Sequence, residues 1–152
     1  MLRIALNDGK HQGHLAMRFM MLMIPPSYET PPSDLDAERM KAMMKYNEAL
    51  KDAGVLIALD GLHPPSTGAR VSFRTGKPVV TDGPFTEAKE VLGGYWMIDV
   101  ASREEAIAWA SRCPASADEI IEIRRVHEIG EYAEEFQQQV AGFAELKKAD
   151  GD

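Results

Sequence analysis

The sequence predicts an α+β domain in which strands and helices follow the order β-α-β-β-α-β. Its 152 residues suit a single domain with its own hydrophobic core. Strand-length apolar runs occupy residues 18–24, 55–59, 95–100 and 120–126, and apolar residues at helical spacing follow the first and the third run. This order is typical of the ferredoxin-like fold, an antiparallel sheet with two helices on one face. The open face of such a sheet is usually covered by another copy.

The first strand and the first helix are marked by local signals. Residues 18–24 carry no polar side chain after Arg18, which favours a buried central strand over an edge strand. Prolines at 25, 26, 31 and 32 end this strand. Ser33 and Asp36 form a start resembling a capping box, and Gly54 supplies a C-terminal stop. We therefore expect the first helix over residues 34–53.

A β-hairpin is predicted between the second and the third strand. Residues 69–74 alternate between polar and apolar side chains with period two, and residues 78–81 return after a turn at 75–77. Pro78 has no backbone N–H to give to a ladder, so this arm is expected to lie at an edge. The hairpin is thus an insertion into the ferredoxin-like order.

The second half of the chain repeats the same kinds of signal. Gly93 and Gly94 open the third strand, and Ser102 with Glu105 forms a capping box for a helix that must end before Pro114. The tail at 131–148 carries an apolar stripe at helical spacing, made of Tyr132, Phe136, Val140, Phe143 and Leu146. We expect an extra C-terminal helix whose stripe is buried on its own domain or on a second subunit.

Three regions follow from this pass along the chain. Residues 1–16 are expected to form a mobile N-terminal arm, residues 17–130 the α+β domain, and residues 131–152 a C-terminal helical extension.

The composition of the chain excludes several classes of function. The net charge is 17 − 24 = −7, which disfavours direct contact with nucleic acid. No apolar run approaches the length of a membrane span. The single cysteine, Cys113, excludes an internal disulfide, and no Cys/His cluster has zinc spacing. We therefore expect a cytoplasmic protein with no metal, no cofactor, no membrane partner and no direct nucleic-acid partner.

The strongest candidate site is the turn Thr81-Asp82-Gly83-Pro84-Phe85. Gly83 permits a positive φ and Pro84 fixes its own φ, so Asp82 is expected to sit on a rigid corner. His63, in a loop that flanks the same hairpin, could meet Asp82 and form a general acid/base pair. The alternative is that Asp82 accepts hydrogen bonds from nearby backbone N–H groups and stabilises the turn, while His63 is solvated.

Five further residues are candidates for binding a ligand. Tyr95 and Trp96 point to opposite faces of their strand, so one is expected to pack on the helices and the other to face a dimer interface or a cavity. Arg74 and Lys89 are candidate anion contacts, and Glu87 is a further titratable group on a loop. Packing in the core or at an interface is the alternative for both aromatic residues. Cys113 follows a helix C-terminus, where the dipole does not favour a thiolate nucleophile.

Several short motifs carry a family resemblance. In chain order they are Gly61-Leu62-His63-Pro64-Pro65, Val79-Val80-Thr81-Asp82-Gly83-Pro84-Phe85, Glu87-Ala88-Lys89-Glu90, Leu92-Gly93-Gly94-Tyr95-Trp96, Ala108-Trp109-Ala110 and Glu122-Ile123-Arg124. In order and spacing they resemble the DGPF-motif branch of the YCII-related family. The resemblance implies a homodimeric α/β-barrel in which two sheets pack face to face. It also implies a possible link to extracytoplasmic-function sigma factors, beside which related domains are encoded.

One departure from the family pattern bears on the chemistry. Better-studied YCII-type proteins carry a histidine on the first helix and an aspartate just before a proline after the second helix. Here residues 34–53 contain no histidine, and the residue before Pro114 is Cys113. That pair therefore cannot be carried over to this chain.

Three functions are compatible with the sequence. The first is a homodimer that binds or transforms a small molecule in a cleft between the sheet and the hairpin, near the Asp-Gly-Pro-Phe turn. The second is a non-catalytic regulatory module that acts on sigma-factor-dependent transcription through a protein partner. The third, by analogy of fold alone, is a heme- or oxygen-dependent monooxygenase. Whether the protein is an enzyme stays open at this point.

Overall fold

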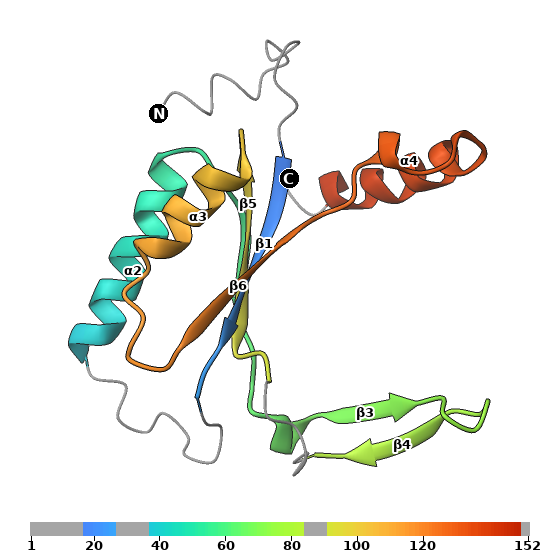
Figure 1. Cartoon of the computed structure of the whole chain (residues 1–152), viewed down its shortest axis with the longest axis horizontal. Coiled ribbons are helices and arrows are strands. Elements are labelled where there is room, and N and C mark those ends of the chain that lie inside the picture. Colours follow the sequence, from blue (N-terminus) through green and yellow to red (C-terminus); the bar gives the residue numbers. More distant parts are fainter. Residues whose placement is uncertain (1–16, 27–36, 84–90, 150–152) are drawn as a thin grey trace.

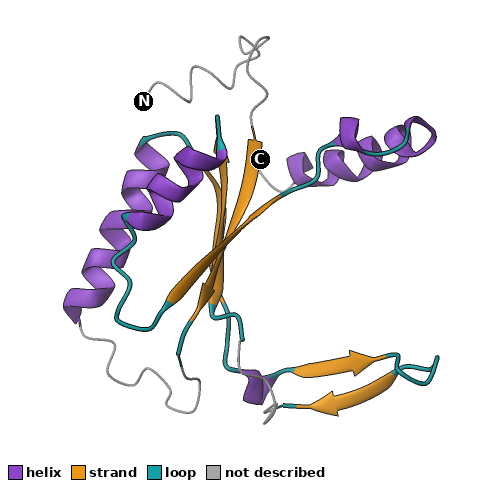
Figure 2. Cartoon of the chain, in the orientation of Figure 1, coloured by secondary structure: helices purple, strands orange, loops and turns teal. Residues whose placement is uncertain are grey.

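The structure, a computed structural model, describes residues 17–26, 37–83 and 91–149, with side chains described as far as Phe143 (Figure 1). A four-stranded sheet carries helices α2 (Ala37–Asp52) and α3 (Arg103–Ser111) on the same face. The β3–β4 hairpin and helix α4 project on the other side of the sheet (Figures 1 and 2). Among the described elements, none is packed over that second face of the sheet.

The sheet contains β1 (Met17–Ile24), β2 (Leu56–Gly61), β5 (Gly94–Val100) and β6 (Ile120–Arg125). Their order is β2-β5-β1-β6, and every neighbouring pair is antiparallel. This is the ferredoxin-like arrangement, so the predicted fold class is confirmed. The strand at 18–24 lies in the interior of the sheet, as its unbroken apolar run predicted.

The hydrophobic core lies between the sheet and the two helices. Its fully buried members include Met21 from β1 and Ile98 and Val100 from β5. The Trp96 indole N–H donates a 2.8 Å hydrogen bond to Asn47 Oδ1 on α2, and the Tyr46 ring meets the indole edge-on at 5.8 Å. These contacts attach α2 to the centre of the sheet.

The end of α2 and the start of α3 lie where the local signals predicted. The Ser102 hydroxyl accepts a hydrogen bond from the Glu105 backbone N–H at 3.1 Å, which confirms the cap of α3. Gly54 adopts a φ of 71° after α2, a conformation that glycine tolerates best. The predicted start of the first helix at Ser33 and Asp36 lies outside the described residues.

The predicted hairpin is present as a sheet of its own. Strands β3 (Ala69–Ser72) and β4 (Val79–Asp82) pair antiparallel, and Gly76 supplies the positive φ of 79° that the turn requires. A short 3₁₀ turn, η1 (Pro65–Thr67), precedes β3. Both hairpin strands are almost entirely exposed, because no other described element packs extensively against them.

The predicted C-terminal helix is α4 (Glu134–Ala149), which follows the 3₁₀ turn η2 (Ile129–Glu131). Phe136 and Phe143 of the predicted stripe are exposed at 48% and 69%, so their side chains are not buried against their own domain. The Leu146 side chain lies outside the described part of the chain. None of the helices described is long and apolar enough to cross a membrane.

Candidate functional site

Two loops and the end of β4 meet at the base of the hairpin. The Leu62 backbone N–H donates to the Gly93 carbonyl at 2.9 Å, and the Gly83 N–H donates to the Gly68 carbonyl at 3.0 Å. Gly83 approaches Pro65 so closely that a Cβ atom at this position would overlap the Pro65 carbonyl oxygen. The loop that carries His63 and the corner that carries Asp82 are thereby held next to each other.

The reason for glycine at position 83 differs from the one that the sequence suggested. Gly54 and Gly76 are the glycines with positive φ among the described residues, and Gly83 is not one of them. The structure does not use the positive φ that glycine permits at this position. Glycine is needed instead because the backbone of the η1 turn occupies the place of a side chain.

His63 and Asp82 each lie within two residues of the close contact between Pro65 and Gly83, and both side chains are exposed. Asp82 is the last residue of β4 and pairs with Ala69, while His63 lies two residues before η1. No described hydrogen bond or ion pair joins the imidazole to the carboxylate. The acid/base pair stays a prediction, as does the alternative in which Asp82 stabilises its own turn.

Tyr95 and Trp96 lie on opposite faces of β5, as predicted. Trp96 is buried under α2, where its indole is part of the core packing described above. Tyr95 lies on the face without helices, and its hydroxyl donates a 2.6 Å hydrogen bond to Asp60 Oδ2. This bond, with the nearby Asp60 charge, raises the pKa of the Tyr95 hydroxyl. Ligand binding by either aromatic residue stays a prediction, and the structure gives the Trp96 indole a packing role.

The other predicted ligand residues are not gathered at this site. Arg74 lies in the turn at the far end of the hairpin, since Ser72 pairs with Val79 there and Ala69 pairs with Asp82 at the base. Glu87 and Lys89 lie outside the described residues. Of the residues predicted for the site, His63 and Asp82 are the two that lie within two residues of the contact between Pro65 and Gly83.

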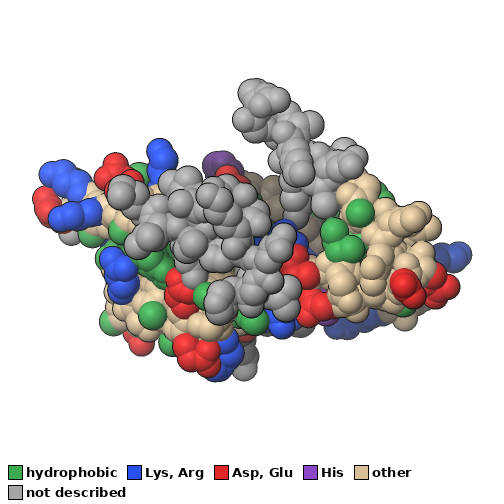
Figure 3. Space-filling view, turned by 90° about the horizontal axis from the view of Figure 1, so that it is seen from above, with side chains coloured by type: hydrophobic (Ala, Val, Ile, Leu, Met, Phe, Trp, Pro, Cys, Tyr) green, Lys and Arg blue, Asp and Glu red, His purple; other side chains and the backbone are tan. Residues whose placement is uncertain are grey.

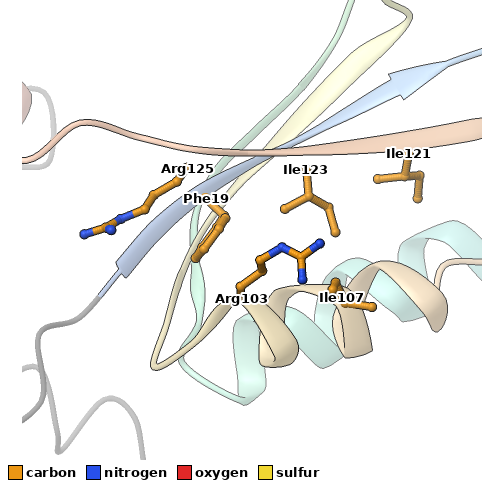
Figure 4. A pocket seen from close by; sticks show the side chains of 6 residues that line it. All are labelled: Phe19, Arg103, Ile107, Ile121, Ile123 and Arg125. Carbon is orange, nitrogen blue, oxygen red and sulfur yellow. The ribbon is translucent and has the colours of Figure 1, made fainter.

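A second site, which sequence reasoning missed, lies between α3 and β6. It is a hollow of about 400 Å³ lined by Phe19, Arg103, Ile107, Ile121, Ile123 and Arg125 (Figure 4). It does not lie between the sheet and the hairpin, where a pocket was expected. Two features of the sequence could have indicated this hollow. Arg103 and Ile107 have the i, i+4 spacing that places them on one face of a helix. Residues 121, 123 and 125 alternate and so lie on one face of a strand.

Cys113 lies just before Pro114, after the C-terminal end of α3. The thiol is half-buried, and burial raises its pKa to about 11, with the Glu119 charge adding to the rise and Arg39 opposing it. Glu119 itself accepts hydrogen bonds from Arg39 and Ser116. The thiol is therefore protonated at neutral pH and is a poor nucleophile, in line with the sequence-based expectation.

Charged side chains of both signs lie on the face of the molecule that is seen from above (Figure 3). Seen from above, Lys and Arg side chains lie among Asp and Glu side chains and hydrophobic side chains on the described part of that face (Figure 3). Within the described ranges, no group of three or more His, Cys, Asp or Glu side chains is arranged to hold a metal ion.

Comparison with known proteins places the fold in a family. Residues 17–130 match the YCII-related domain, which is the greater part of the chain. This chain belongs to the YCII-related family. The predicted family resemblance is thus confirmed, while membership of the DGPF-motif branch stays a prediction.

A similar protein is known from Rhizobium meliloti (strain 1021), where it is named as an uncharacterized protein. It is 35% identical to this YCII-related chain over 75 residues. The match covers 49% of this chain and 60% of the relative, so the two are compared over part of their lengths.

Proposed function

We propose that this YCII-related protein is a homodimer that binds or transforms a small molecule in a cleft near its Asp-Gly-Pro-Phe turn. The observation that carries the proposal is the closed base of the hairpin, where backbone hydrogen bonds from Leu62 and Gly83 fix the two loops. His63 and Asp82 lie on these neighbouring stretches of backbone, which supports a shared role for the imidazole and the carboxylate. Such a pair is suited to hydrogen bonding with a polar ligand or to moving a proton on it.

The uncovered face of the sheet supports the homodimer. The register pairs Met20 with Met97 and Leu22 with Tyr95, so these side chains form one apolar stripe on the face without helices. These four side chains are half-buried in the single chain, Arg124 and Asp60 flank them in the same register, and a second sheet packed face to face would cover them.

The hairpin supplies the second argument for the homodimer. Phe73 and Val80 are exposed at 66% and 64%, although a two-stranded hairpin is at best marginally stable when isolated in water. A partner subunit that packs against the hairpin would bury these side chains. It would also add a wall beside Asp82, which turns an exposed corner into a cleft.

The ligand prediction is tested by what remains bound after purification. The wild-type protein and Asp82→Asn are purified in parallel, and small molecules released by denaturation are identified by mass spectrometry. We expect a compound that is stoichiometric with the wild-type protein and at least about tenfold depleted in Asp82→Asn, because a charged hydrogen-bond acceptor has been lost. The control is Glu134→Gln, which removes an exposed carboxylate from α4.

Other outcomes of the same preparation would redirect the proposal. Equal retention of the compound by wild type and Asp82→Asn contradicts a ligand at this turn. A second polypeptide that remains bound in place of a small molecule favours the regulatory module, and a heme absorbance band favours the monooxygenase.

A further inference from the structure

The hollow between α3 and β6 is separate from the hairpin site. It lies on the helix-bearing face beside β6, which is one edge of the sheet, whereas the hairpin is inserted after β2, which is the opposite edge. Its volume of about 400 Å³ is within the range of small-molecule sites. A ligand here would not depend on Asp82 or His63.

Four apolar side chains line the hollow together with its two arginines. Phe19 forms part of the buried core, and Ile121 and Ile123 of β6 are only partly covered by the helices. Ile107 on α3 is 38% exposed although it lies opposite these strand residues. The short helix α3 therefore leaves an apolar surface on β6 that a ligand body could cover.

Two arginines give the hollow a positive charge. The Arg103 guanidinium extends from the first turn of α3 into the space between helix and strand (Figure 4). Arg125 lies at one end of the hollow and turns outward, 3.5 Å from Glu131 Oε1. Within the described residues no carboxylate lies at ion-pair distance from Arg103, so its guanidinium donors are available to an anion.

The position of Arg103 in its helix adds to the argument. A cation in the first turn of a helix faces the positive end of the helix dipole, which is the less favourable end, and Glu104 and Glu105 in the same turn offset part of this conflict. A bound anion between Arg103 and β6 would remove this conflict, because it would interact favourably with the guanidinium.

We propose that this hollow binds a small amphipathic anion, whose carboxylate or phosphate head is held by Arg103 and whose apolar body lies on Ile121 and Ile123. Arginine suits this role because its planar fork of N–H groups matches both head groups. The head group is therefore an oxyanion. Titration with a carboxylate probe and a phosphate probe shows which of the two is bound more tightly.

Calorimetric titration of the full chain with hexanoate, hexyl phosphate, acetate and hexan-1-ol tests the proposal. We expect saturable binding of at least one of the two six-carbon anions, and the tighter of them identifies the head group. Hexan-1-ol lacks the charge and acetate lacks the apolar body, so each is expected to bind at least about tenfold more weakly.

Variants then assign the binding to the hollow. Arg103→Gln is expected to weaken the six-carbon anion about tenfold or more, and Arg103→Lys to weaken it less, because the charge is kept. The control is Arg112→Gln at the other end of α3, whose guanidinium lies over the Trp109 ring and does not line the hollow. Thermal melting of each variant shows whether the fold is kept.

Three results would overturn the proposal. The first is that neither six-carbon anion shows saturable binding. The second is that the wild type and a folded Arg103→Gln bind the anion equally well. The third is that hexan-1-ol binds as tightly as the six-carbon anions. Asp82→Asn should leave this binding unchanged. Failure at the hollow is therefore distinct from failure of the function proposed at the hairpin.

Discussion

The indole of Trp96 is tied to helix α2 by one hydrogen bond, which its N–H donates to Asn47 Oδ1 at 2.8 Å. The indole is buried, so Asn47→Ala would leave this donor without its acceptor. We expect the substitution to lower the free energy of unfolding by about 1–3 kcal/mol. Urea denaturation followed by tryptophan fluorescence measures the change.

A matched control separates the lost hydrogen bond from a general effect on helices. Gln138→Ala removes an exposed amide from α4 and is expected to change stability by less than about 0.5 kcal/mol. If both variants denature at the same urea concentration as the wild type, the hydrogen bond from Trp96 is not stabilising.

The raised pKa of the Cys113 thiol can be tested by the rate at which the thiol is alkylated. Burial raises the pKa of its thiol from 9.0 to about 11, so at pH 9.0 the folded protein holds far less thiolate than the unfolded chain. We expect alkylation by iodoacetamide at that pH to be about fiftyfold slower in the native protein than in guanidinium chloride, because only the thiolate reacts. Mass spectrometry at timed intervals gives both rates.

The same pKa shift has a consequence for stability. Because the pKa of the thiol is raised in the folded state, its contribution to the free energy of unfolding is fully present below pH 9 and is lost as pH rises towards 11.

The alkylation test has one outcome that would contradict the packing observed. A native alkylation rate that equals the denatured rate would show that Cys113 is exposed.

At the level of elements, the attachment of the hairpin depends on Gly83. A methyl group at this position would overlap the Pro65 carbonyl, and backbone atoms cannot yield as a flexible side chain can. Gly83→Ala is expected to cost about 1–3 kcal/mol through overpacking. It should also raise the hydrogen-exchange rate of the Leu62 amide, which is bonded to Gly93 at the same base.

Gly61→Ala is the matched control, since it is in the same stretch of chain and a Cβ there meets nothing within 4 Å. It is expected to leave the exchange of the Leu62 amide unchanged. Equal effects of the two substitutions would mean that the close approach of Gly83 to Pro65 does not hold the hairpin base together.

The elements could be predicted because their signals are local. The apolar run at 18–24, the cap at Ser102 and the stop at Gly54 each depend on residues within a few positions of one another. The hollow could not be predicted, because it depends on how closely α3 approaches β6, two elements that pack through tertiary contacts. Gly83 was recognised as important for the wrong reason, since the partner that excludes a side chain is Pro65, far away in sequence.

At the level of the whole molecule, α4 raises the question of what covers its apolar stripe. The sequence predicted that the stripe is buried on its own domain or on a second subunit, and Phe136 and Phe143 are exposed in the single chain. The helix lies beyond residues 17–130, which are the residues that match the YCII-related domain. A second copy is then the expected cover.

If a second copy covers the stripe, charged substitutions in the stripe should weaken the dimer. The wild-type chain of 16.8 kDa should elute with twice its mass when size exclusion is combined with light scattering. Phe136→Lys together with Phe143→Lys should shift the protein towards the monomer, because two buried ring contacts are replaced by cations that must be desolvated. Circular dichroism should show that the strands and helices of the domain remain.

Gln138→Lys is the control, since it adds a cation to an exposed position of the same helix that is not part of the stripe. It should leave the mass at that of the dimer, because the added charge stays in water. If the double variant remains dimeric at the lowest measurable concentration, α4 does not contribute to the interface. The partner would then be held by the open sheet face and the hairpin without α4, since their apolar side chains remain to be covered in the single chain.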